Sequence, residues 1–241
     1  MSGKKICLVI PCYNEKSRLN MSAFIDKKDI MFLFVNDCSN DGTSQFLKDN
    51  LEGTNHLVLD LAKNFGKANA VREGMLFLSQ NPIFEQIEWI GFWDADLAVS
   101  LDEVDNYLEF RNYFYKDYDA IFGSRIVRLG SNIRKKLIRS ILGKCFIFLI
   151  RQIFDTNIYD SQCGAKIFKK DLLEIAFGEK FISNWVFDIE ILLRLNSRNY
   201  KIVEYPLQKC FEDTNGSNVK ILREAFRIIL DLIKIKKRYI K

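Results

Sequence analysis

Residues Trp89 to Ser100 read WIGFWDADLAVS, and this stretch decides the fold that the sequence predicts. Five mostly apolar residues favour a strand that is buried on both faces, and the strand ends in two aspartates, Asp94 and Asp96, one residue apart. Like charges so close repel each other, and each carboxylate costs free energy to desolvate unless a cation compensates it. The stretch therefore predicts a site for a positive group at the end of a buried strand.

Four further apolar runs have the same form, because each is short, rich in β-branched or aromatic residues and followed by polar side chains. Residues 16–28, 42–50 and 67–78 lie between the first four strands and favour helices. This alternation predicts an α/β fold whose mostly parallel sheet has helices on both faces and a ligand beyond the carboxyl ends of its strands. The four runs and their polar ends are KICLVIP with Pro11–Glu15, MFLFVN with Asn36–Thr43, HLVLDL with Lys63–Lys67, and DAIFG with Gly123–Arg125.

Length and composition exclude several classes of protein. The chain has 241 residues, of which 48% are hydrophobic, and this suits one large α/β domain with a buried core. No apolar run approaches the ~18 residues of a spanning helix, and the N-terminus favours a first strand over a secretory signal. The six cysteines form no C-x-x-C pair, so we expect reduced thiols and a cytoplasmic location. The absence of G-x-x-x-x-G-K-[ST] and G-x-G-x-x-G disfavours an ATPase and a dinucleotide dehydrogenase.

The two aspartates after the central strand carry oxygen ligands that suit a hard cation. A turn after the strand can bring Asp94 and Asp96 toward one Mg²⁺ or Mn²⁺, which would also bind phosphate oxygens. The alternatives are a pair of surface loop acids, or N-caps for a helix over residues 101–110. Asp37, at the end of another buried strand, can accept the imide N–H of uracil. These residues together favour a nucleoside diphosphate as the ligand.

Eight short motifs, in this order and spacing, resemble those of glycosyltransferase family 2, whose nucleotide-sugar-binding fold is called GT-A. The last three narrow the resemblance to the dolichyl-phosphate β-glucosyltransferases and their bacterial polyprenyl-phosphate relatives, and the whole set covers nearly the entire chain. Asn36, Cys38 and Ala98 stand where relatives commonly have Asp, Gly and Gln, which bears on the sugar more than on the chemistry. The motifs are IPCYNE, VNDCSNDGT, KNFGKANAVREG, DADLA, GSR, DSQCGAK, NWVFDIE and TNGS.

The resemblance implies roles for the matching residues. Asp94 and Asp96 would hold Mg²⁺ or Mn²⁺ together with the diphosphate. Arg125 and an arginine on the next helix, Arg139 or alternatively Arg134, would bind the phosphate of the acceptor. Lys67 would lie near the base and ribose, and Gln162 near the donor sugar. The residues implied to contact the nucleotide sugar are Pro11, Tyr13, Asn14, Glu15, Asp37, Lys67, Asp94, Ala95, Asp96 and Gln162.

Asp188 occupies the position of a catalytic base in relatives that use hydroxyl acceptors. Two interpretations remain open: it orients Arg125 or Gln162, or it acts as the base toward a saccharide acceptor. We expect Glu190 to be structural, and Trp185 and Phe187 to belong to the core or to a pocket wall.

Two basic segments stand out against an otherwise acidic chain. Residues 125–151 hold eight Lys or Arg and no acid, and residues 218–241 carry a net charge of +6. Residues 218–241 also place apolar side chains on one helical face, which predicts an amphipathic helix on an anionic membrane surface, and residues 133–154 suit a second interfacial helix. The alternative is a solvated helix that packs on the domain. We therefore divide the chain into a GT-A domain, 1–217, and a C-terminal helix, 218–241.

These features predict an inverting, metal-dependent transfer of a sugar from a nucleotide sugar to the phosphate of a polyprenyl or dolichyl phosphate. UDP-glucose is the donor that the resemblance favours, and a phosphate acceptor needs no strong base because it is already an anion. We expect a peripheral protein on the cytoplasmic face of a membrane, and an integral-membrane partner is left open. The alternatives are a saccharide acceptor in capsule or lipopolysaccharide synthesis, or a non-catalytic binding protein. Nucleic acid is disfavoured because the basic segments lack recognition motifs.

Overall fold

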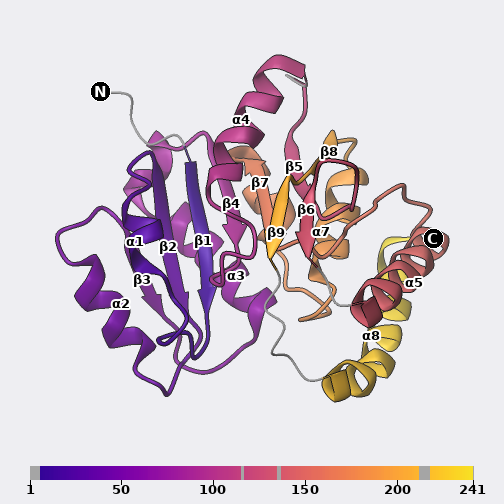
Figure 1. The fold of residues 1–241 in the computed structure, drawn as a ribbon, viewed down its shortest axis with the longest axis horizontal. Coiled ribbons are helices and arrows are strands. Elements are labelled where there is room, and N and C mark those ends of the chain that lie inside the picture. The colour runs from indigo at the N-terminus through magenta and orange to yellow at the C-terminus, as the bar shows by residue number, and fades with distance from the viewer. Residues whose placement is uncertain (1–5, 115–116, 135–136, 212–217, 241) are drawn as a thin grey trace.

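The computed structural model describes residues 6–114, 117–134, 137–211 and 218–240, which fold around one seven-stranded sheet (Figure 1). The strand order is β3-β2-β1-β4-β7-β5-β8, and every strand is parallel to its neighbours except β7, which is antiparallel to β4 and β5. The predicted mostly parallel sheet is therefore confirmed. The strands are β1 (Ile6–Cys12), β2 (Ile30–Asn36), β3 (Leu57–Asp60), β4 (Trp89–Trp93), β5 (Ala120–Ser124), β7 (Ala165–Lys169) and β8 (Ile202–Pro206).

Helices cover both faces of the sheet, as the alternating pattern predicts. A small second sheet pairs β6 with β9 in parallel. The helices are α1 (Met21–Ile25), α2 (Thr43–Leu51), α3 (Lys67–Ser79), α4 (Asp102–Phe114), α5 (Leu137–Phe154), α6 (Leu173–Phe177), α7 (Phe187–Asn196) and α8 (Asn218–Tyr239), the short 3-10 turns are Pro82–Gln86 and Lys170–Leu172, and the second sheet is β6 (Asn132–Arg134) with β9 (Lys209–Phe211).

Side chains of β1 alternate between two hydrophobic cores, one on each face of the sheet. Cys7 and Val9 pack into the core that α3, α6 and α7 cover, whereas Leu8 and Ile10 pack into the core that α1, α2 and α4 cover. On α3, a Cβ at Gly74 would lie 2.7 Å from the side chains of Val9 and Val35, so only glycine lets this helix lie so close to the sheet. The close contact fixes the N-terminus of α3 beside the strand ends.

The helix predicted over residues 16–28 is shorter than expected, because α1 spans only Met21–Ile25. The residues before it form turns in which the backbone N–H groups of Arg18 and Leu19 donate to the carbonyl of Glu15. The backbone N–H of Lys16 donates to Thr43 Oγ1 at 3.1 Å, which ties the segment to the loop after β2. The turns before α1 are therefore held by the loop after β2, and the helix begins only where the side chain of Asn20 caps it.

The helix predicted over residues 218–241 is present as α8. The helix predicted over residues 133–154 begins only at Leu137, as α5, because Asn132–Arg134 pair with β9 as strand β6. Both helices lie at one end of the molecule (Figure 1). Leu232 and Ile235 of α8 are fully buried in the core beneath α7, and Arg194 of α7 donates to the hydroxyl of Tyr239 at 2.9 Å. The second half of α8 is therefore part of the packed core. No helix in the described part of the chain combines the length and apolar character that crossing a membrane requires.

Candidate active site

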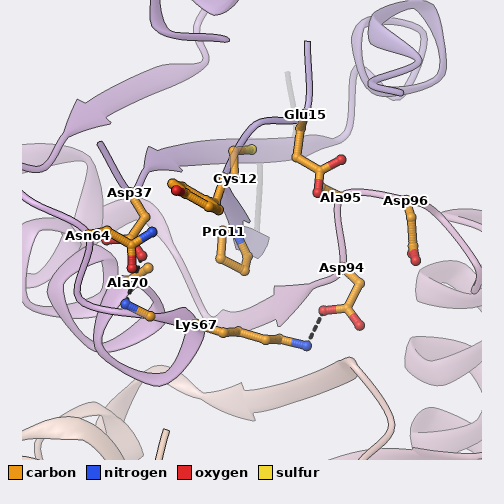
Figure 2. Close-up of a pocket in the computed structure, with 12 residues that line it drawn as sticks. Pro11, Cys12, Glu15, Asp37, Asn64, Lys67, Ala70, Asp94, Ala95 and Asp96 are labelled. Carbon is orange, nitrogen blue, oxygen red and sulfur yellow. Dashed lines mark hydrogen bonds and ion pairs between the residues drawn. The ribbon is translucent and has the colours of Figure 1, made fainter. Parts of the chain in front are cut away.

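A pocket of about 440 Å³ opens at the carboxyl ends of β1, β2 and β4 (Figure 2). The chain order of the strands reverses between β1 and β4, and open α/β sheets bind ligands at such a point. Of the predicted nucleotide contacts, all line the pocket except Asn14 and Gln162. The lining residues are Pro11, Cys12, Tyr13, Glu15, Asp37, Asn64, Gly66, Lys67, Ala70, Asp94, Ala95 and Asp96.

Asn14 joins the loops after β1 and β2 and does not line the pocket. Its backbone is in the left-handed region, with φ 54°, which asparagine tolerates better than most residues. Its N–H donates to Ser39 Oγ at 2.9 Å, and its side-chain oxygen accepts the N–H of Asn40 at 3.0 Å. The N–H of Glu15 donates to Thr43 Oγ1 at 3.0 Å. These bonds fix the two loops that carry Tyr13, Glu15 and Asp37.

Asp37 is buried at the end of β2 and holds the loop that precedes α3. Its two carboxylate oxygens accept the backbone N–H groups of Phe65 and Gly66, both at 2.8 Å. Gly66 has φ +83°, a conformation that favours glycine, and the amide of Asn184 lies 3.1 Å from the place of its missing Cβ. Asp37 therefore positions the start of α3, in addition to any contact with a base.

Lys67, the first residue of α3, points across the pocket to Asp94, and the two side chains form an ion pair (Figure 2). This is a cation beside the aspartate pair at the end of β4. Enclosure by the pocket lowers the pKa of Lys67, but Asp94 and Asp188 raise it by more, so the pKa lies above its usual value. The ammonium of Lys67 therefore lies at the Asp94 end of the pocket.

Asp94 and Asp96, the predicted ligands for a hard cation, both line the pocket, and so does the carboxylate of Glu15. Burial raises the pKa of Glu15, Arg18 lowers it, and Asp96 and Asp41 raise it, with a net upward shift. No three acids, histidines or cysteines of the described residues come close enough to form a complete metal cage. Two carboxylates that leave the other positions to water and phosphate are what Mg²⁺ takes beside nucleotides. The residues present fit Mg²⁺ or Mn²⁺ in that way.

Gly164 makes room for the Asp94 side chain. A Cβ on Gly164 would lie 1.9–2.5 Å from the Asp94 carboxyl group, closer than any side chain allows. The backbone N–H of Asp94 also donates to the Gly164 carbonyl at 3.0 Å. The motif DSQCGAK therefore places its glycine directly behind the aspartate.

Lys166 and Asp188 form a buried ion pair between β7 and α7, with 2.6 Å from Lys166 Nζ to Asp188 Oδ1. The ammonium also donates to the carbonyls of Ser161 and Cys163, at 3.0 and 2.6 Å, so its three N–H groups are all used. Burial raises the pKa of Asp188, while Lys166 and Lys67 oppose the shift. The prediction that Asp188 orients Arg125 or Gln162 is wrong in this respect, because the side chain that it holds is Lys166.

Asp160 holds Arg125 at the end of β5. The guanidinium donates from Nε and Nη2 to the two carboxylate oxygens at 2.7 and 2.9 Å, and the Arg125 backbone N–H donates to the same group. Glu204 accepts the backbone N–H of Asp160 and so fixes this aspartate. Arg125 lines a small cavity of about 20 Å³ that also touches Asp94 and Gly164. Arg125 and the main pocket therefore lie on two sides of Asp94.

The remaining predicted residues have mixed positions. Gln162 donates to the carbonyl of Trp185 at 3.1 Å, and Trp185 itself is 54% exposed, so it is not a core residue. Phe187 is buried in the core, as expected. Glu190 accepts the backbone N–H groups of residues 182 and 183 and is structural, also as expected. The backbones of Arg134 and Arg139 belong to β6 and α5, and their side chains lie outside the described residues.

Sequence reasoning missed Lys166 and Asp160 as residues of the site. Both lie in the quoted motif DSQCGAK, and a lysine inside the apolar run AKIF is itself a signal. A lysine on a buried strand needs a buried acid, and Asp188 is that acid. No pattern shows which acid pairs with which base across the chain.

The sheet topology and the pocket at its switch point define an α/β protein of the GT-A type, and solved structures of this type superpose on it. Glucosyl-3-phosphoglycerate synthase from Mycobacterium tuberculosis, in complex with Mn²⁺, UDP and its product, matches with a TM-score of 0.70 at 12% identity, over 98% of this chain and 81% of that one. A mannosyltransferase from Pyrobaculum calidifontis, in complex with GDP-Man and Mn²⁺, matches with a TM-score of 0.65 at 17% identity, over 96% of this chain and 64% of that one. The predicted fold is confirmed.

The chain belongs to glycosyl transferase family 2, whose family model matches residues 7–176. Relatives called dolichyl-phosphate beta-glucosyltransferase cover nearly all of it. The protein of Dictyostelium discoideum is 25% identical over 98% of this chain and 75% of its own length. The human protein is 28% identical over 98% of this chain and 76% of its own length. The chain is therefore a glycosyltransferase, as predicted.

Proposed function

We propose that the protein transfers a sugar from a UDP-sugar to the phosphate of a polyprenyl or dolichyl phosphate, with inversion at the anomeric carbon. The observation that carries the proposal is the buried pair of Asp188 with Lys166. If Asp188 took a proton from a hydroxyl acceptor, the fully buried ammonium of Lys166 would lose the carboxylate with which it pairs. An acceptor that is already an anion makes no such demand, because it needs no base.

The donor site is assigned to the main pocket. Pro11, Tyr13, Glu15 and Asp37 would frame the nucleoside, with Tyr13 exposed at the pocket edge. The relatives' name, dolichyl-phosphate beta-glucosyltransferase, and the UDP in one group of solved structures support UDP-glucose as the first donor to test. Asn14 acts through the loops that it fixes, and Gln162 would reach the sugar beside Trp185.

Asp94 and Asp96 would hold Mg²⁺ or Mn²⁺, and Ala95 between them lines the same wall. The cation, when bound, neutralises charge on the diphosphate that leaves. Lys67 adds a second positive charge from the opposite wall of the pocket. Both charges favour departure of the nucleoside diphosphate.

The transfer step needs no proton movement. A phosphate oxygen of the acceptor forms a bond to the anomeric carbon, the bond from that carbon to the diphosphate oxygen breaks, and the electron pair leaves with UDP. Arg125 would hold the acceptor phosphate, with Arg139 as its partner and Arg134 as the alternative. The bidentate bonds from Asp160 keep the Arg125 guanidinium oriented for this task. Without these cations the two phosphate groups would repel each other.

The acceptor's long apolar chain suits the exposed faces of α5 and α8, which we propose as the membrane contact. Leu142, Phe148 and Leu149 of α5 are exposed, as are Ile229 and Ile233 of α8. Basic side chains on both segments would attract an anionic leaflet, in keeping with a peripheral protein on the cytoplasmic face. The division into residues 1–217 and 218–241 remains part of this proposal, as does an integral-membrane partner.

The test is a transfer assay with purified protein and labelled UDP-glucose, UDP-galactose and GDP-mannose. Acceptors are a short polyprenyl phosphate and the matched polyprenol, which lacks only the phosphate. We expect label in the lipid extract with the phosphate and none with the alcohol, with UDP-glucose as the best donor. Transfer to the alcohol or to a soluble saccharide at a comparable rate would refute the proposal.

A further inference from the structure

Four side chains of alternating charge run from the core to the pocket. Lys166 is fully buried and bonds Asp188 at 2.6 Å, and Lys67 contacts Asp94 (Figure 2). Asp188 also acts on Lys67, since its carboxylate raises the pKa of that lysine together with Asp94. Lys67 thus pairs with a carboxylate at the proposed metal site, while the buried Lys166 pairs with a carboxylate in the core.

We propose that Lys67 competes with the divalent cation for Asp94, so that the metal binds strongly only together with the nucleoside diphosphate. This inference rests on the proposed function, because it takes the cation and the diphosphate as ligands of the pocket. An aspartate that already pairs with a lysine attracts a second cation less strongly. A diphosphate brings oxygens of its own for the metal and offers Lys67 another anionic partner.

The two lysines differ in their freedom to move. Lys166 has no exposed surface and has acceptors for all three of its N–H groups, so it is fixed. The Lys67 side chain is 40% exposed, and its flexible stem starts at the first residue of α3. Lys67 is thus built as an exchangeable cation and Lys166 as a permanent one.

The competition makes a direct prediction for metal binding in the absence of nucleotide. If Lys67 competes for Asp94, removal of its charge should strengthen the binding of Mn²⁺. If Lys67 served only to bind phosphate, the same substitution should leave Mn²⁺ binding unchanged. Free Mn²⁺ is measured by electron paramagnetic resonance for the wild type, Lys67→Met, Lys67→Arg and Lys63→Met. Lys63 is the matched control, because it is exposed on the same loop and lies over the ring of Phe65.

We expect Lys67→Met to lower the Kd for Mn²⁺ about tenfold without nucleotide, a change of the size of one neighbouring charge at a partly exposed site. Lys67→Arg should stay within about twofold of the wild type, and so should Lys63→Met, because both keep the charge beside Asp94. With UDP and Mn²⁺ present, Lys67→Met should bind UDP about tenfold more weakly. Lys67→Gln should repeat these results if the methionine variant is poorly folded by thermal melting.

An unchanged or higher Kd for Mn²⁺ in Lys67→Met without nucleotide would refute the competition. A gain in Mn²⁺ affinity that persists equally in Lys67→Arg would also refute it, because the charge is then irrelevant. The readout requires no acceptor and no transfer. Failure of the lipid-phosphate assay therefore leaves the metal result standing, and failure of the metal result leaves the assay standing.

Discussion

The pocket proposed to bind the nucleotide and the exposed α5/α8 face are built in opposite ways. In the pocket, loops from different strands hold one another through side-chain bonds to backbone groups, as Asp37 does for Gly66. On the α5/α8 face, large apolar side chains are left in solvent, and Phe148 is 65% exposed. A compact, charged ligand needs fixed polar groups, whereas a long apolar chain or a membrane surface needs exposed apolar area. Under the proposed function, donor and acceptor would therefore be recognised by different physical means.

Arg125, at the end of β5, combines features of the two regions. Its guanidinium is fixed by Asp160 in the manner of the pocket. The residues that follow it are exposed and partly apolar: Val127 is 67% exposed and Leu129 fully exposed. A phosphate bound at Arg125 would therefore leave its apolar tail beside apolar side chains.

The largest effect is expected at the metal end of the pocket. Asp96→Asn should lower turnover by about a thousandfold or more, because it removes a ligand of the cation that stabilises the leaving group. Asp96 is exposed, so the fold should persist with an unchanged melting temperature. Transfer to lipid phosphate is measured with and without EDTA, and Mg²⁺ or Mn²⁺ should restore activity to the chelated wild type.

Asp105→Asn is the matched control, because Asp105 is an exposed acid on α4. It should retain nearly full activity. Full activity of the wild type in EDTA would show that no metal ion acts in the pocket, and would refute the role proposed for Asp94 and Asp96.

A smaller effect is expected at Arg125. Arg125→Ala should lower kcat/KM for the lipid phosphate about 100-fold, the loss expected for a charge-assisted, bidentate phosphate contact. UDP affinity should change less than about threefold by calorimetry, since the nucleoside pocket is untouched. Arg128→Ala, an exposed arginine of the same loop, should have little effect on either quantity. Equal losses in both for Arg125→Ala would place this arginine in the donor site.

The pocket region could be predicted from the sequence because its signals are local. A continuous apolar run followed by polar side chains predicted β1, β2, β3, β4 and β5, since strands buried on both faces have that form. The strand β7 was not predicted, because Lys166 interrupts its apolar run. That lysine is acceptable only with Asp188, a partner 22 residues away in the chain. Pairings of this kind depend on packing and not on pattern.

The two-sided packing of α8 was also beyond sequence reasoning. The pattern predicted one apolar face, and the structure leaves Ile229, Leu230 and Ile233 of that face exposed. Leu232 and Ile235 form a second apolar face, which packs into the core. Helical periodicity shows which residues share a face but not which face the core covers. Removal of the whole helix is therefore expected to destabilise the domain.

Point substitutions separate the two faces of α8. Ile229→Ser with Ile233→Ser should weaken binding to anionic liposomes about tenfold and leave the melting temperature unchanged, because the lost apolar contact is with the membrane. Leu232→Ser should lower the melting temperature, because it places a hydroxyl in the buried face. Co-sedimentation and thermal melting measure the two quantities. If substitution of Ile229 and Ile233 lowers the melting temperature and leaves co-sedimentation unchanged, the exposed α5/α8 face is a protein-packing surface and not a membrane contact.

The smallest effect is expected at Asn36, one of the departures from the family pattern. Asn36 donates to Asp60 Oδ1 at 2.8 Å, and Lys48 contacts the other oxygen of Asp60 at 2.6 Å. Burial raises the pKa of Asp60, but Lys48, Ser44 and Asn36 lower it by more, so the net pKa lies below the usual 3.8. An aspartate at position 36 would place a second carboxylate against the first, which gives this departure a structural reason.

Asn36→Asp should therefore lower the free energy of unfolding by about 1 kcal/mol at neutral pH, a modest value because Asp60 is partly exposed. In the wild type, the stability from Asp60 is present above its usual pKa of 3.8 and is lost as pH falls through the lower folded value. In the variant, repulsion raises the pKa of one carboxyl group, so protonation relieves the cost as pH falls. Urea unfolding at several pH values should show a gap that narrows toward acid. The opposite outcome is a difference in unfolding free energy between wild type and variant that widens toward acid or is absent at neutral pH. Either result would show that the polar bonds of Asn36 and Asp60 do not fix the ends of β2 and β3. The loops beside the pocket would then be less rigid than their hydrogen bonds indicate.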